Sequence, residues 1–152
     1  PFAKELLHVQ DEKAAGTSGG TFNSGAWRTR TINTIRTNEI SGASLASDQI
    51  TLPAGTYYIE ASAPGYRMDR HQIALYNITD TSFEIDGTSE YTLAASLVQT
   101  RSTVCGRFTI TATKNFEILH RGETTQTTYG FGVESNFGQN SIYTDVKIWR
   151  VA

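Results

Sequence analysis

Short stretches in which apolar and polar residues alternate, each closed by a proline or glycine turn, constrain this chain more than any other feature. The clearest stretch runs from Thr56 to Ala63, with Tyr57, Ile59 and Ala61 on one side and polar or half-polar residues between them. Pro53-Ala54-Gly55 precedes it and Pro64-Gly65 follows it. A period of two predicts a strand with one buried face, and proline and glycine predict the turns that bound it.

The same pattern recurs along the chain, whereas helical periodicity is absent after the first dozen residues. Eight to ten short strands separated by regular turns predict an all-β sandwich or barrel. The opening segment carries Leu6, Leu7 and Val9 and is expected to form a short strand. The further predicted strands are Trp27–Ile35, Ile50–Leu52, Gln72–Ile78, Phe83–Ile85, Tyr91–Leu97, Thr103–Thr111, Asn115–His120, Tyr129–Val133 and Ile142–Val151.

Length and composition narrow the class of protein further. The 152 residues suit one domain, which we divide into a stem remnant and first strand at 1–15 and the main domain at 16–152. A net charge of -2 without a basic run argues against nucleic acid as a partner, and no apolar stretch approaches the roughly 20 residues of a membrane helix. The single Cys105 excludes an internal disulfide and is expected to be a buried thiol.

No set of residues has the pattern of a catalytic or metal site. Gly16-Thr17-Ser18-Gly19-Gly20 matches a nucleophile-elbow pattern, but it lies in a glycine-rich loop without the flanking strand and helix that such a serine needs. Glu84 and Asp86 are expected on a solvated strand face, and the three histidines lack metal-ligand spacing. We therefore predict no enzymatic activity, no cofactor and no metal.

The last predicted strand has two contrasting faces. Ile142, Thr144, Val146 and Ile148 are expected to point into the core, and the opposite face carries Tyr143, Asp145, Lys147 and Trp149. Two large aromatic residues that frame a charge pair are typical of a subunit interface. A strand that is simply exposed to solvent is the alternative.

A second cluster lies in the segment 64–71, which is expected to be a loop between strands. It holds Tyr66, Arg67, Asp69, Arg70 and His71. Aromatic rings, guanidinium groups and a carboxylate together bind polar ligands, sugars included, through stacking and paired hydrogen bonds. The alternative is an ordinary solvated loop.

The order of these segments resembles the jelly-roll domains of complement heads and tumour necrosis factor. Ile50-Thr51-Leu52-Pro53-Ala54-Gly55-Thr56-Tyr57-Tyr58-Ile59 looks like their stretch T-x-P-x-x-G-x-Y-x-F, and Gln72 to Asn77 resembles the strand that follows it. The closing Phe137 to Val151 is similar to their final hairpin half, although Tyr143-Thr144-Asp145-Val146 replaces the usual F-S-G-F. The resemblance implies an all-β, homotrimeric jelly-roll sandwich of two antiparallel sheets without catalytic residues. The calcium sites frequent in that family match no motif here.

Two further segments, His8-Val9-Gln10-Asp11 and Asp145-Val146-Lys147-Ile148-Trp149, resemble the C-terminal domains of bacteriophage tail fibres and related virion proteins. This resemblance implies a receptor-binding tip that attaches a virion to a bacterial surface glycan or protein. The family topology implies that residues 16–26, 64–71, about 94–101 and 134–141 meet at the apex, where Asn136 and Gln139 join the expected ligand-binding residues. A purely structural trimerisation domain, a secreted cytokine-like or complement-like ligand and a hydrolase are the alternatives.

Overall fold

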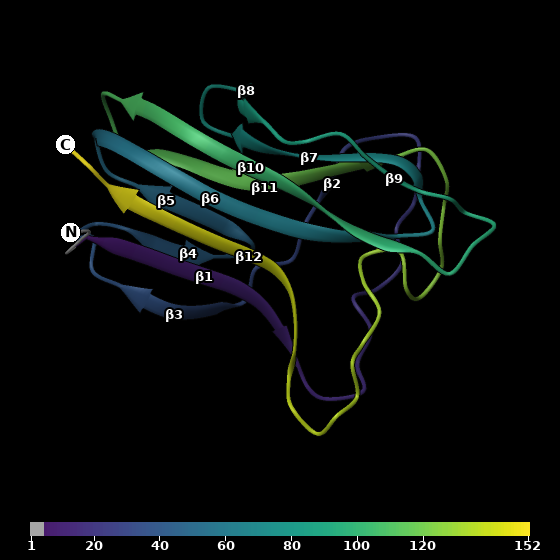
Figure 1. Cartoon of the computed structure of the whole chain (residues 1–152). Helices are drawn as coiled ribbons and strands as arrows, with labels where there is room; N and C mark the ends of the chain where they lie inside the picture. The colour runs from purple at the N-terminus through teal and green to yellow at the C-terminus, as the bar shows by residue number, and fades with distance from the viewer. Residues whose placement is uncertain (1–4) are drawn as a thin grey trace.

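Two antiparallel sheets lie face to face in the computed structural model, which describes residues 5–152 (Figure 1). The first sheet has the strand order β10-β6-β12-β1-β3, and the second has the order β4-β5-β11-β7-β8 with β2 paired to β11 and β9 paired to β7. The strands are β1 (Leu6–Lys13), β2 (Arg28–Thr29), β3 (Thr34–Asn38), β4 (Ser44–Ala46), β5 (Gln49–Leu52), β6 (Gly55–Tyr66), β7 (Asp69–Asn77), β8 (Ser82–Asp86), β9 (Glu90–Thr92), β10 (Gln99–Ile110), β11 (Lys114–Gly122) and β12 (Ser141–Arg150).

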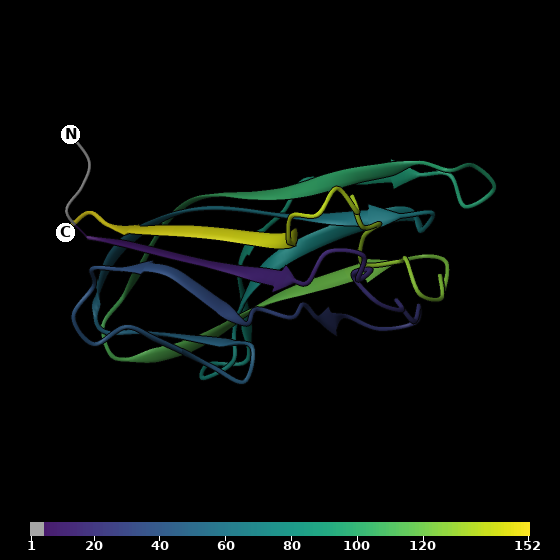
Figure 2. The same ribbon diagram turned by 90° about the horizontal axis from the view of Figure 1, so that it is seen from below.

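The core fills the space between the two sheets, and the sequence alternation places it there. Tyr57, Ile59 and Ala61 of β6 are buried, as their spacing predicts, and they belong to one cluster with residues of the opposite sheet such as Ile73 and Phe116. The longer strands β1, β6, β7, β10, β11 and β12 thus contribute alternate side chains to a single apolar layer. Figure 2 shows the molecule from below, with the paired strands β1 (purple) and β12 (yellow) side by side.

The predicted single strand Trp27–Ile35 is wrong, because this segment changes sheets. β2 pairs with β11 in the second sheet, whereas β3 pairs with β1 in the first. Between them the backbone crosses from one layer to the other, and the Arg30 and Asn33 amides donate to Ile118 and Gln10 respectively. The alternation survives the crossing, since Arg30 and Ile32 are buried.

The predicted end of the central strand at Pro64-Gly65 is also wrong, because β6 continues to Tyr66. Along β6 the pairing with β12 stops at Ser62, whereas the pairing with β10 continues from Ser62 to Tyr66. Pro64 thus lies where one side of β6 has become an edge, and a residue without an N–H is tolerated there.

Three smaller expectations also fail. Tyr129–Val133 forms turns and irregular backbone, and only Glu90–Thr92 of the Tyr91 segment is a strand. Ile142 is 39 % exposed, although Thr144, Val146 and Ile148 of the same strand are buried as expected. The stem remnant that we place at the start of the chain lies partly at residues 1–4, outside the described residues.

The beginning of β1 and the end of β12 lie together at one end of the sandwich (Figure 1). The loops that follow β1, β6, β9 and β11 lie toward the opposite end, which we call the apical end, as the resemblance implies. Backbone hydrogen bonds join them there: Gly19 N donates to Gly132 O at 2.8 Å, Tyr66 N to Gly130 O at 3.0 Å and Arg67 N to Val98 O at 3.2 Å.

Candidate functional site

The predicted loop 64–71 is a two-residue turn, Arg67–Met68, that carries the chain from β6 in one sheet to β7 in the other. Arg67 and Asp69 adopt φ values of 54° and 58°, a region that non-glycine residues rarely occupy. Met68 between them is fully buried. Such backbone is kept only where neighbouring groups hold it.

Those neighbouring groups come from the loops beside the turn. The Arg67 Nε donates to Ala94 O at 2.7 Å, and Asp69 Oδ1 accepts from Ala94 N at 2.9 Å. The Thr124 hydroxyl donates to the other oxygen of Asp69 and is the main cause of the lowered pKa of that carboxyl. Both carboxylate oxygens are therefore engaged within the chain, which gives Asp69 a structural role in the turn.

Tyr66 and Arg70 leave the turn in different directions. Tyr66 is half-buried and its ring meets Tyr129 edge-on at 6.2 Å between centroids. Arg70 is exposed on β7 and forms an ion pair with Glu123. Because successive residues of a strand face opposite sides, Arg70 points out of the sandwich.

His71, the last residue of the predicted ligand-binding segment, points inward. It is 3 % exposed, and it lies 2.9 Å from the Nε2 of His120 and 2.9 Å from the hydroxyl of Thr100. Burial, with the nearby positive charge of Arg30, lowers the pKa of His71 to about 4. Burial likewise holds the pKa of His120 well below its usual value. Both imidazoles are neutral at physiological pH.

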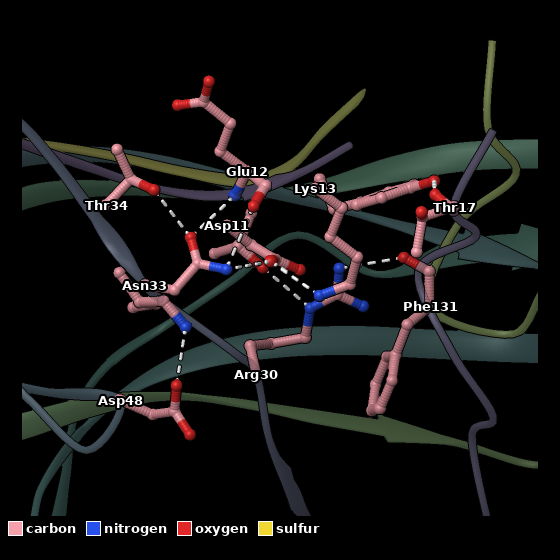
Figure 3. Close-up of polar contacts among 12 residues, drawn as sticks. Asp11, Glu12, Lys13, Thr17, Arg30, Asn33, Thr34, Asp48 and Phe131 are labelled. Atoms are coloured by element: carbon pink, nitrogen blue, oxygen red, sulfur yellow. Dashed lines mark hydrogen bonds and ion pairs between the residues drawn. The ribbon is translucent and has the colours of Figure 1, made fainter. Parts of the chain in front are cut away.

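Arg30 is the buried charge beside these histidines, and nothing in its local sequence distinguishes it. Its guanidinium donates to the Thr144 hydroxyl at 2.8 Å, to Pro64 O at 3.1 Å and to Phe131 O at 2.9 Å. Burial lowers its pKa to about 9, and the charge of Asp11 opposes that shift. Figure 3 shows the Arg30 side chain between Asp11 and Phe131. Arg30 therefore links β12, β6 and the 131 loop from inside the sandwich.

The remaining two predicted ligand-binding residues, Asn136 and Gln139, are exposed in the loop between β11 and β12. Gln139 lines a hollow of about 480 Å³ with His8, Gln10 and Arg36, at β1 and β3. The turn residues Tyr66 and Arg67 do not line it. The structure therefore divides the predicted residues between at least two places.

The outward surface of the first sheet combines aromatic and charged side chains from four strands. We call it the open face, and it consists of His8, Gln10, Tyr58, Glu60, Cys105, Arg107, Asp145, Lys147 and Trp149. Trp149 pairs with Tyr58 across the strands, with ring centroids 6.2 Å apart. Asp145 lies 2.6 Å from His8 and 3.4 Å from Lys147. No second layer of residues 5–152 covers this sheet on that side.

Two expectations about this sheet need correction. Tyr143 was expected on the exposed side with Asp145, but it is 2 % exposed and its hydroxyl donates to Thr17 O at 2.6 Å. Its ring also meets Gly132, so the loops of the apical end cover it. Cys105 was expected to be buried and is exposed, 3.9 Å from the Tyr58 hydroxyl. The polar neighbours of β10 on this side give a small thiol no apolar cover.

Further features bear on catalysis, metals and membranes. Glu84 and Asp86 lie on β8, and Asp86 is exposed. Among residues 5–152, no group of three or more histidine, cysteine, aspartate or glutamate side chains is arranged to hold a metal ion. The described part of the chain also has no helix of the length and apolar character that crosses a membrane.

Comparisons with known proteins identify the fold. No family model and no curated protein sequence matches the chain. Among solved structures, it is similar to the globular domain of zebrafish complement 1qA protein, with a TM-score of 0.63, 11 % identity and 98 % of each chain covered. It is also similar to murine APRIL, with a TM-score of 0.54, 7 % identity and 95 % of this chain and 97 % of that chain covered. The chain has the complement-head and tumour-necrosis-factor-like jelly-roll fold, and the predicted fold class of two antiparallel sheets is confirmed.

Proposed function

We propose that this chain is the receptor-binding domain of a homotrimeric virion fibre of the bacteriophage tail-fibre type. It attaches to a glycan or protein on a bacterial surface, without catalysis and without a cofactor, and it works outside the cell on the virion. The open face carries this proposal, because a single chain leaves its aromatic and charged side chains without a covering layer.

The composition of the open face favours association between copies of the chain. Interfaces are enriched in aromatic residues, and charges at them pair or lie at the rim. Trp149 and Tyr58 form the aromatic part, while Asp145 and Lys147 supply charges of both signs. The fold neighbours share the same sandwich, and the sequence resemblance to virion proteins includes Asp145 to Trp149.

The receptor-binding surface is proposed at the apical end, opposite the end where β1 begins and β12 ends. Tyr66, Arg67 and Arg70 lie at or beside the turn there, and Asn136 and Gln139 lie in the loop before β12. Loops that a rigid scaffold holds in place commonly carry binding residues. The hydrogen bonds that fix Arg67 and Asp69 give this turn a defined shape before any partner arrives.

Two measurements test this function. Light scattering at micromolar concentration should give about three times the 16.7 kDa chain mass. The fluorescently labelled domain should attach to one or more strains of a bacterial panel in flow cytometry, and Tyr66→Ala with Arg67→Ala should weaken that attachment. A monomer would contradict the assembly, and a trimer that attaches to no strain would favour a purely structural domain.

The absence of catalysis has its own measurement. Surface polysaccharide from a strain that binds the domain should keep its chain length after long incubation, as size-exclusion chromatography would show. Depolymerisation would contradict the proposal, and Glu84 and Asp86 would then be the first carboxylates to replace.

A further inference from the structure

A groove of about 820 Å³ lies on the outer side of the second sheet, away from the open face. Its floor comes from outward residues of two paired strands, Gln72 of β7 and Arg121 of β11, which are partners in the sheet register. Arg70 lies beside Gln72 on β7, and Tyr91 of β9 pairs with Arg70. Trp27, directly before β2, contributes a second aromatic side chain. The volume lies within the range of small-ligand sites.

Hydrogen bonds and ring contacts inside the chain hold the groove in shape. The Trp27 ring contacts Phe83 at 5.1 Å between centroids, and Arg28 donates to Asn23 O at 2.7 Å and to Ser24 O at 3.0 Å. On the floor, Gln72 Nε2 donates to Gly87 O at 2.8 Å. A site that is already ordered loses less conformational freedom when a ligand binds.

Some of the polar groups in the groove remain available. Arg70 is paired with Glu123. Within residues 5–152, however, no hydrogen bond or ion pair engages the guanidinium of Arg121 or the carboxylate of Glu90, and both line the groove. A guanidinium offers parallel N–H donors and a carboxylate offers two acceptors, so each can hold two neighbouring hydroxyl groups.

The charges in the groove balance. The lining includes Arg70, Arg121, Glu90 and Glu123, so it has two positive and two negative side chains. This balance gives no attraction for an anion or a cation. Tyr91 is 53 % exposed, and its ring, like that of Trp27, can lie against the C–H face of a pyranose.

From these features we infer that the groove between Trp27 and Tyr91 binds a neutral saccharide, which would be the chemical class of the bacterial receptor. The inference rests on the proposed attachment function and adds a sugar contact on the outer sheet to the receptor contacts proposed at the turn. Because the groove and the open face belong to different sheets, a trimer built on the open face leaves all three grooves outside. Three linked sites raise the overall binding strength by a factor on the order of a hundred or more over one site.

The direct test measures sugar binding by the intact domain. The indole N–H signal of Trp27 is followed by NMR while methyl α-D-mannopyranoside, methyl β-D-galactopyranoside, methyl α-L-rhamnopyranoside or N-acetylneuraminic acid is added. At least one neutral glycoside should shift the signal, with a dissociation constant on the order of millimolar because few exposed contacts are made. No shift with any neutral glycoside, or a shift with the acidic sugar alone, would overturn the inference.

Matched variants separate the groove from the turn. Tyr91→Ala and Arg121→Ala, both at exposed positions, should each raise the dissociation constant for the sugar at least tenfold. Tyr91→Phe keeps the aromatic ring and should bind the sugar like the wild type. Tyr66→Ala with Arg67→Ala should leave sugar binding unchanged, since neither residue lines the groove. Loss of sugar binding in that double variant, with retention in Tyr91→Ala, would place the sugar at the turn and overturn the inference.

Measuring attachment to cells distinguishes two outcomes: one in which the groove inference is wrong, and one in which the proposed attachment function is wrong. If the wild type attaches to cells and Tyr91→Ala with Arg121→Ala attaches equally well, the function stands and the groove is not the receptor contact. If the Trp27 signal shifts with a neutral sugar but no strain is bound, the groove stands and the bacterial attachment function fails. Light scattering of each variant checks that its mass matches that of the wild type.

Discussion

Arg30 is the residue on which the interior depends most. Its buried guanidinium donates to two backbone carbonyls, Pro64 O and Phe131 O. The same group lies 4.4 Å from the centre of the Phe131 ring. A carbonyl that loses its only buried donor bears the full desolvation cost, so this side chain matters more than an average hydrogen-bond donor.

We therefore expect Arg30→Met to lower the free energy of unfolding by about 3 kcal/mol, because it leaves the Pro64 and Phe131 carbonyls without this donor. Urea unfolding at fixed subunit concentration measures the change. Arg36→Met is the matched control, since Arg36 is exposed and, within the described residues 5–152, pairs with Glu12 alone at 3.5 Å. An equal loss of unfolding free energy in the two variants would show that the buried contacts of Arg30 stabilise the fold no more than the exposed ion pair of Arg36 does.

The buried histidines predict a dependence of stability on pH. The pKa of His71 is about 4 in the folded chain, below the usual value near 6.5 that applies when the chain is unfolded. Above pH 6.5 neither state binds the proton. As the pH falls from 6.5 towards 4, the unfolded state takes up the proton first, and each histidine costs up to about 1.4 kcal/mol of stability per pH unit.

We expect His71→Gln to reduce the slope of unfolding free energy against pH between 6.5 and 5, where carboxylates contribute little. Glutamine can keep hydrogen bonds to Thr100 and His120 while it removes the titrating group. Urea midpoints at half-unit pH steps measure the slope. A wild-type midpoint that stays flat from pH 7 to pH 5 would contradict the assignment of neutral, buried imidazoles.

At the scale of elements, the turn between β6 and β7 is one of two links that join the two sheets through only two residues, among the strands that the structure describes. Two residues change layers there, with left-handed backbone at Arg67 and Asp69 on either side of the buried Met68. The side chain of Asp69 connects this turn to the segments at Ala94 and Thr124. One carboxylate thus holds three connections in register.

Replacement of Asp69 tests that role. Asp69→Ala should destabilise the fold by about 2 kcal/mol, because it removes both hydrogen bonds and places alanine in left-handed backbone. Asp69→Asn should cost less than about 1 kcal/mol, because asparagine tolerates this backbone and can still accept from Ala94 N. Thermal unfolding of the two variants gives the comparison, and the same loss in both would assign the effect to the charge.

The alternation of apolar and polar residues predicts those strands whose burial depends on that alternation. The buried side of β6 follows from the alternation of Tyr57, Ile59 and Ala61, and most strands were placed within a few residues. Arg30 could not be recognised, because its partners at Pro64 and Phe131 lie far away along the chain. The strand predicted at Tyr129–Val133 failed for the same reason. The backbone of this segment forms hydrogen bonds with Gly19 and Gly20, in a distant loop, and does not form a strand.

The groove was missed for a related cause. Trp27 and Tyr91 come together only because β2 and β9 flank the paired strands β11 and β7. In the sequence, Trp27 looked like the start of a strand and Tyr91 like part of a weak one. An aromatic residue that follows a glycine-rich loop is the one local signal that pointed to this place, and it does not identify the partner.

At the scale of the whole molecule, assembly and stability are expected to be linked. Trp149→Ala removes the largest side chain of the open face, so the melting temperature should fall and depend on subunit concentration. Differential scanning calorimetry at two concentrations tenfold apart measures this. Tyr91→Ala removes an exposed aromatic ring from the other sheet and should change neither the mass nor the concentration dependence. If both variants behave alike, the open face is not the interface.

The proximity of the two ends of the described chain has one more consequence. Arg150 N donates to Glu5 O at 3.0 Å, and Thr56 accepts from the amides of Val151 and Ala152. The backbone is thus close to a closed ring, and a short peptide bridge there would join its ends with little strain. If the two ends were joined, the position of the new chain termini would decide which strand is synthesised first. The sandwich is defined by neighbour relations among its strands, and a circularly permuted gene that opens an exposed loop would encode the same set of neighbours.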